Sequence, residues 1–108
     1  MYEVIKSNRF NIWLENLRDR VAAARITARI RLAEQGNLGD WKALRDGISE
    51  MRVNVGAGYR IYFTRHGQNF IVLLVGGDKR SQAKDIQQAI ELAEQWKDEN
   101  HEDDPKGV

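Results

Sequence analysis

Two stretches of the sequence place arginine and lysine where they could bind a polyanion. The first, MRVNVGAGYRIYF at residues 51–63, carries Arg52 and Arg60 in apolar runs on either side of a glycine-rich turn. The second, GGDKRSQAK at residues 76–84, carries Lys79, Arg80 and Lys84. A guanidinium can donate two hydrogen bonds to a phosphate and keeps its charge, while an ammonium adds a compact positive charge. These residue types predict a phosphate-binding site.

The glycines at positions 56 and 58 do not indicate a nucleotide-binding loop. A dinucleotide fingerprint or a P-loop needs its glycines between a strand and a helix. Here they lead from one alternating stretch into another, and no Gly-Lys-Ser/Thr follows them. They predict a hairpin instead, with strands at residues 48–55 and 59–65 joined by a three-residue loop at residues 56–58.

The hairpin decides which side chains share a face of the sheet. Side chains alternate between the two faces of a strand, so the pairing separates an apolar face from a polar one. The expected apolar pairs are Val55 with Tyr59, Val53 with Ile61 and Met51 with Phe63, and the expected polar pairs are Asn54 with Arg60, Arg52 with Tyr62 and Glu50 with Thr64.

The polar face has two interpretations, and the sequence leaves both open. Glu50, Arg52 and Arg60 could form ordinary cross-strand charge pairs on a solvated surface, worth roughly 0.2–1 kcal/mol each. Alternatively, the two arginines and Asn54 could bind a phosphate, with the ring of Tyr62 available for a base to stack on.

Other elements must position these residues. Residues 2–6 alternate weakly and predict a short strand, and helical spacing predicts one helix that begins after Ser7 or Asn8 and another at about residues 21–35. Residues 70–75 are apolar without alternation, which predicts a strand covered on both faces. A last helix is expected at about residues 81–98, capped by Asp78 or Ser81. Lys79 and Arg80 would then lie at a helix N-terminus, where anions are favoured.

Composition narrows the classes of protein. A chain of 108 residues with 42% hydrophobic residues predicts a single domain at residues 1–98, followed by a flexible acidic tail at residues 99–108. There is no cysteine and only two histidines, so we expect neither a metal site nor a cofactor. No apolar run approaches the roughly 20 residues that cross a bilayer, so we expect a cytoplasmic protein without membrane contact.

The formal net charge of +1 conceals an uneven distribution. Residues 1–84 hold 15 Lys/Arg and 8 Asp/Glu, whereas residues 85–108 hold 2 and 8. A basic body suggests a polyanionic partner, with nucleic acid the first candidate. The alternative is a solvated surface that happens to be uneven.

Three stretches taken together resemble the RelE/ParE superfamily of toxins from bacterial type II toxin-antitoxin modules, and more closely the addiction-module killer proteins related to HigB. They are FNIWLENLRDRVAAARITARI, GNLGDWKALRDGISEMRVNVGAGYRIYF and VLLVGGDKRSQAKDI, within residues 10–86. The resemblance implies an α+β, RelE-like fold. A short N-terminal strand and two helices on a twisted antiparallel sheet would be followed by a C-terminal helix.

The resemblance also implies an activity and partners. RelE-like toxins cleave mRNA on the ribosome and arrest growth, so a metal-independent, RNA-binding endoribonuclease is expected here. The cognate antitoxin would be a helix-turn-helix protein, and the free toxin a monomer or weak homodimer. The residues that match the family's site are Arg60, Arg52, Asn54, Lys79 and Arg80.

We assign charge stabilisation in this reaction to Arg60 and Arg52, with Arg80 as a helper. The segment SQAKDI at residues 81–86 lacks the tyrosine or histidine that many RelE-like toxins have there. Lys79 and Tyr62 are therefore the candidates for acid or base, with Glu50 as a third. Asn54, Arg80, Glu50 and Lys84 complete the expected RNA-binding set.

The sequence is also compatible with two other functions. One is a ParE-like gyrase inhibitor that acts by protein binding through the helical arginines at positions 18, 20, 25, 29 and 31. The other is an interaction module without toxicity.

Overall fold

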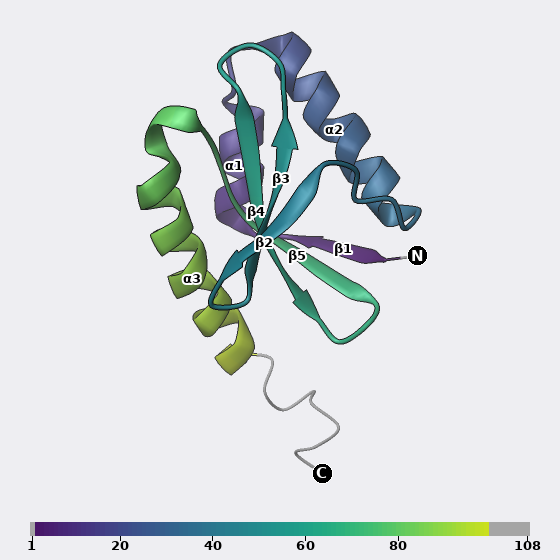
Figure 1. Ribbon diagram of the computed structural model, residues 1–108, viewed down its shortest axis with the longest axis vertical. Coiled ribbons are helices and arrows are strands. Elements are labelled where there is room, and N and C mark those ends of the chain that lie inside the picture. The colour runs from purple at the N-terminus through teal and green to yellow at the C-terminus, as the bar shows by residue number, and fades with distance from the viewer. Residues whose placement is uncertain (1, 100–108) are drawn as a thin grey trace.

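The computed structural model describes residues 2–99, which form a five-stranded sheet with helices on both of its faces (Figure 1). The strands lie in the order β1-β5-β4-β3-β2. The elements in chain order are β1 (Glu3–Lys6), α1 (Asn8–Glu15), α2 (Arg20–Glu34), β2 (Trp41–Arg45), β3 (Ile48–Val53), β4 (Tyr59–His66), β5 (Phe70–Asp78), the 3₁₀ turn η1 (Lys79–Ser81) and α3 (Gln82–Glu99).

The sheet is antiparallel from β2 to β5 and becomes mixed at β1. β1 runs parallel to β5, with Glu3 paired to Phe70 and Lys6 to Leu73. The predicted α+β class, with a short N-terminal strand, two helices on the sheet and a C-terminal helix, is confirmed. α3 ends at Glu99, so the expected acidic tail lies outside the described residues from position 100 onward.

Capping side chains fix where the first two helices begin. The Ser7 hydroxyl accepts a hydrogen bond from the Phe10 amide at 2.9 Å and donates one to the Leu74 carbonyl at 2.7 Å, which ties the start of α1 to β5. Asp19 caps α2 by accepting from the Ala22 amide at 3.0 Å. The two predicted helices are therefore separate, joined by a short polar corner.

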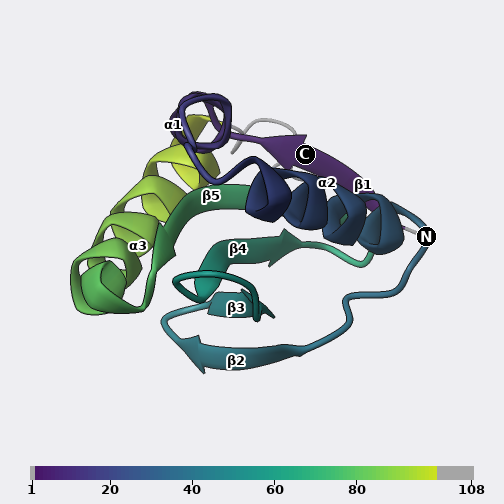
Figure 2. The ribbon, with the colours of Figure 1, turned by 90° about the horizontal axis from the view of Figure 1, so that it is seen from above.

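Each face of the sheet has its own hydrophobic core. On one face, α1 and α2 cover a cluster that includes Phe10, Ile26 and Ile61. On the other, α3 covers a second cluster that includes Tyr62, Leu74 and Ala89. Figure 2 shows the strands stacked from β5 down to β2, with α3 at their left, α2 at the upper right beside β1 and β5, and α1 at the top. The prediction that residues 70–75 form a strand covered on both faces is confirmed.

The hairpin register differs from the sequence prediction. Arg52 pairs with Arg60, Glu50 with Tyr62 and Met51 with Ile61, so each β3 residue faces a partner two positions earlier than expected. The loop is longer than three residues, because β3 ends at Val53 and the Gly58 amide donates to the Val55 carbonyl at 3.0 Å. A shift of two residues leaves every side chain on its predicted face.

Candidate nucleic-acid interface

Glu50 lies between the two arginines of the hairpin. Its Oε1 accepts a hydrogen bond from Arg52 Nε at 2.9 Å, and its Oε2 lies 3.9 Å from Arg60 Nε. Arg52 and Arg60 are direct cross-strand partners on β3 and β4. One fully buried carboxylate therefore neutralises part of the charge of two neighbouring guanidinium groups.

The two guanidinium groups differ in exposure and in hydrogen bonding. The Arg52 side chain is 33% exposed and the Arg60 side chain 10%. The hydrogen bond that Arg52 donates to Glu50 is the main reason that the pKa of Arg52 is raised. Arg60 Nε and Nη1 are buried and have no hydrogen-bond partner among the described residues. Glu50 approaches both arginines at Nε, so the terminal nitrogens of Arg52 stay available to a ligand.

The first residues of α3 close over this polar group. Gln82 Nε2 donates to Glu50 Oε2 at 3.4 Å. The expectation of a solvated polar face is therefore wrong at Glu50 and Tyr62, both fully buried, because α3 packs across that side of the sheet. The ring of Tyr62 offers no surface to a base. Desolvation, followed by the charges of Glu50 and Asp85, raises the pKa of the Tyr62 hydroxyl, which makes it a poor base at neutral pH.

Lys79 reaches the same end of the sheet from η1. Its aliphatic chain crosses Gly58, where an added Cβ would lie 2.9 Å from Lys79 Cε. Gly58 has a φ of +79°, a conformation that other residues rarely adopt. The glycine thus meets two requirements, the turn into β4 and the passage of the lysine. Lys79 is exposed at the start of η1, and its chain crosses the hairpin loop close to the start of β4.

The remaining predicted site residues are more peripheral. Arg80 is 89% exposed, and its Nη2 lies 3.4 Å from the Asp78 carboxylate. Asp78 caps η1 by accepting from the Arg80 amide at 2.8 Å, which is the main cause that lowers the pKa of Asp78. Asn54 is exposed in the loop just beyond β3. Lys84 is also exposed, about 200° around α3 from Gln82, so it faces away from Glu50.

Two supporting residues were not assigned roles from the sequence. Asp85 is buried, accepts a hydrogen bond from the Ser81 hydroxyl at 2.5 Å and lies against Gly77, where an added Cβ would overlap its carboxylate. Gln82 contacts Glu50, as described above. Both lie on one side of α3, three residues apart. Helical spacing could have revealed that shared side, but the sequence could not show that it faces β3 and β5.

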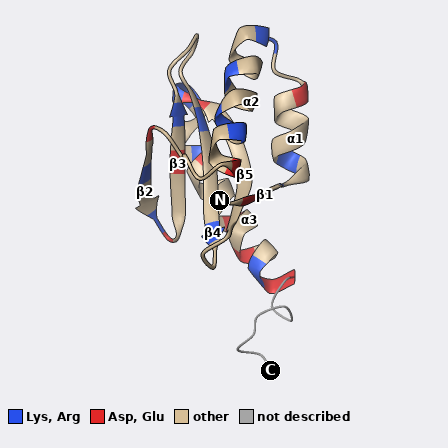
Figure 3. Ribbon diagram, turned by 90° about the vertical axis from the view of Figure 1, so that its right-hand side faces the viewer, with Lys and Arg blue, Asp and Glu red and all other residues tan. Residues whose placement is uncertain are grey.

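The charges of the structure are segregated. Figure 3 shows lysine and arginine on β3, β4 and along α2, while aspartate and glutamate gather toward the C-terminal end of α3. Within residues 2–99, no group of histidine, aspartate and glutamate is placed to hold a metal ion. No helix in this part of the chain is long and apolar enough to span a bilayer.

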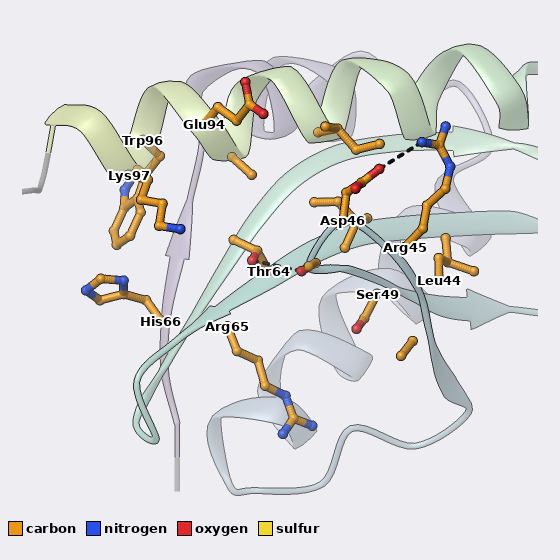
Figure 4. A pocket seen from close by; sticks show the side chains of 15 residues that line it. Leu44, Arg45, Asp46, Ser49, Thr64, Arg65, His66, Glu94, Trp96 and Lys97 are labelled. Atoms are coloured by element: carbon orange, nitrogen blue, oxygen red, sulfur yellow. Dashed lines mark hydrogen bonds and ion pairs between the residues drawn. The ribbon is translucent and has the colours of Figure 1, made fainter.

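A separate groove of about 660 Å³ lies between α3 and the β2–β3 hairpin (Figure 4). Its lining includes Ile48, Thr64 and Trp96 but none of the predicted site residues. His66 and Trp96 meet edge to face at its rim, with ring centroids 4.8 Å apart. The Arg65 guanidinium points away from the groove and lies 4.6 Å from the ring centroid of Trp41.

The mixed sheet, covered on both faces and carrying the arginine pair at one end, is consistent with a RelE-like fold. The family described as Phage derived protein Gp49-like (DUF891) matches residues 12–98, and the chain belongs to this family. It is a family of RelE- and HigB-like toxins, so the chain is related to toxin-antitoxin proteins. An uncharacterized protein of Haemophilus influenzae is 45% identical over 86 residues, which cover 80% of this chain and 87% of that protein.

Proposed function

We propose that the chain is the toxin of a toxin-antitoxin module and that it arrests translation by cleaving mRNA on the ribosome. The observation that carries the proposal is the Glu50-held pair of Arg52 and Arg60 on neighbouring strands. Two guanidinium groups held next to each other by one carboxylate, with Lys79 at the same end of the sheet, offer more phosphate donors in one place than isolated surface arginines would.

RNA cleavage without a metal requires three events. The 2′-hydroxyl loses a proton, charge on the phosphate is stabilised, and the departing 5′ oxygen gains a proton. Arg52 and Arg60 serve the second event, because their charge is permanent and Glu50 limits their motion. Preorganised donors of this kind need no rearrangement as charge develops on the phosphate.

Lys79 is our candidate for the proton that the departing oxygen receives. It is the exposed ammonium nearest in sequence to the end of β5, and its chain is steered across Gly58. Tyr62 and Glu50 are too deeply buried to meet the RNA, so Glu50 acts by holding the arginines. The ribosome would orient the RNA strand and assist removal of the 2′ proton.

The partner follows from the same proposal. A helix-turn-helix antitoxin from a neighbouring gene would bind the chain and block access to Arg52, Arg60 and Lys79. The free toxin would be a monomer or weak homodimer in the cytoplasm. Asn54 and Arg80, both exposed around this end, would contact the RNA backbone, whereas Lys84 faces away from Glu50 and would add only to the general positive charge.

Induced expression with and without the neighbouring gene, followed by mapping of RNA ends, tests the proposal. The wild-type chain should produce new 5′ ends within translated mRNA, and Arg60→Gln should not. Arg65→Gln is the matched control, because Arg65 lies on the same strand but contacts Trp41. Intact mRNA during growth arrest, with trapped DNA breaks, would point to gyrase instead and refute the ribonuclease.

A further inference from the structure

A second basic pocket adjoins the candidate site on the other side of β3. It has a volume of about 290 Å³ and lies between α2 and the end of β3. Its lining includes Arg25, Arg29, Arg52 and Asn54, with Asp40 as the single acidic residue. Pockets for whole organic ligands commonly measure about 300–1,000 Å³, so this one suits a phosphate with part of its sugar.

Arg29 is held rigidly in this pocket. Its Nη1 donates to the carbonyl of Arg52, and its Nη2 donates to the carbonyls of Leu38 at 2.9 Å and Asp40 at 3.2 Å. Gly39 passes so close that an added Cβ would lie 2.9 Å from Arg29 Nη2. The Arg29 charge is therefore fixed in place by neutral carbonyl groups, and its Nε is buried without a hydrogen-bond partner among the described residues.

Arg25 adds a second, uncompensated positive charge. It is exposed one helical turn before Arg29, and within residues 2–99 no carboxylate lies within ion-pair distance of either side chain. Like charges four residues apart on a helix repel by about 0.2–0.5 kcal/mol. A bound anion between them would turn that repulsion into attraction, and a phosphate is the anion whose geometry suits guanidinium groups.

The pocket is continuous with the candidate site through β3. Arg52 lines the pocket and also donates its Nε to Glu50, while its carbonyl is bound by Arg29. We propose that this pocket binds a backbone phosphate of the RNA strand whose neighbouring phosphate contacts Arg52 and Arg60. This inference rests on the proposed function, because it concerns the path of the same RNA strand, which would run from the hairpin toward α2.

Salt-dependent RNA binding separates this pocket from the general positive field. Fluorescence anisotropy with a labelled single-stranded RNA would compare the wild-type chain, Arg25→Gln and the control Arg31→Gln. Arg31 is an exposed arginine of the same helix that lines a different groove. Loss of one phosphate contact on a single strand lowers the slope of log K against log salt by about 0.7. Arg25→Gln should show this change and bind up to about tenfold more weakly, whereas Arg31→Gln should stay within about twofold.

Each outcome is decisive. Equal losses of RNA affinity in the two variants would mean that α2 contributes only its general positive charge. An unchanged salt slope in Arg25→Gln would mean that the pocket holds no phosphate. Either result overturns the inference. Arg60→Gln, measured in the same series, reports on the proposed function independently. If Arg60→Gln binds RNA normally while Arg25→Gln binds it more weakly, the candidate site is wrong but RNA binding in the pocket is supported. A wild-type chain that binds no free RNA overturns the pocket inference, while cleavage on the ribosome is decided separately by the mapping of RNA ends.

Discussion

Arg52 and Arg60 lie directly opposite each other on β3 and β4, a position at which two like charges normally destabilise a sheet. The buried carboxylate of Glu50 makes the arrangement tolerable, since it lies within 2.9 Å of one Nε and 3.9 Å of the other. Burying a carboxylate to offset two adjacent arginines costs desolvation free energy, which an ordinary sheet surface would avoid. The proposed phosphate site would account for this cost, because a bound anion would offset the positive charge that Glu50 leaves uncompensated.

Glu50→Gln should destabilise the fold by about 3 kcal/mol, because it leaves two adjacent guanidinium groups without their buried counterion. Chemical denaturation measures this loss. Glu91→Gln removes an exposed carboxylate of α3 and should change stability by less than about 0.5 kcal/mol. Added phosphate should recover more stability in Glu50→Gln than in the wild type. Equal stability of the two variants would mean that Glu50 does not hold the arginines.

Tyr62→Phe should retain growth arrest and leave stability at pH 7 unchanged or slightly higher, since the hydroxyl is buried without a partner among the described residues. The pKa of Tyr62 is raised in the fold, so the unfolded chain ionises first as the pH increases. The wild-type chain should therefore lose stability above about pH 10, and Tyr62→Phe should lose less. Loss of arrest in a stably folded Tyr62→Phe would restore a catalytic role for the hydroxyl.

Gly77→Ala should destabilise the chain by about 1–3 kcal/mol, because the new methyl group would overlap the Asp85 carboxylate. Asp85 must then move, and with it the hydrogen bond from Ser81 that orders the start of α3. Thermal unfolding of both single variants and of Gly77→Ala combined with Asp85→Ala gives a double-mutant cycle. The alanine at position 77 should cost much less once the carboxylate is gone, and strictly additive losses would contradict this explanation.

Asp78→Ala should cost about 1 kcal/mol, because η1, which leads into α3, loses its capping acceptor, whereas Asp78→Asn keeps an acceptor and should cost less. The pKa of Asp78 is lowered in the fold, mainly by the Arg80 amide. Its ionised form therefore adds stability above the unfolded pKa of about 3.9, and this contribution disappears as the pH falls through the folded pKa. Urea titrations between about pH 3 and pH 7 should show wild type and Asp78→Asn converging in acid. A constant difference across that range would mean that the charge is irrelevant.

The sequence alone determined which side chains share a face of a strand or helix in this protein. Alternation placed Glu50, Arg52, Arg60 and Tyr62 on one face, and that assignment survived a wrong register because the error was an even number of residues. The spacing of apolar residues also predicted the α+β order of elements, and the residue strings predicted the toxin resemblance that the family match supports. These properties depend on neighbours within one strand, turn or helix.

Tertiary structure alone decided which of those side chains meets solvent. α3 lies across the polar face and buries Glu50 and Tyr62, while Arg52 and Lys79 stay accessible beside it. It also brought Arg25 and Arg29 of α2 next to Asn54, although about 25 residues of chain separate them. The periodicity of α3 predicts that one side of the helix is apolar, but it does not predict which part of the sheet that side covers. Burial depends on how elements that are distant in sequence pack against one another, and this packing cannot be read directly from a single sequence.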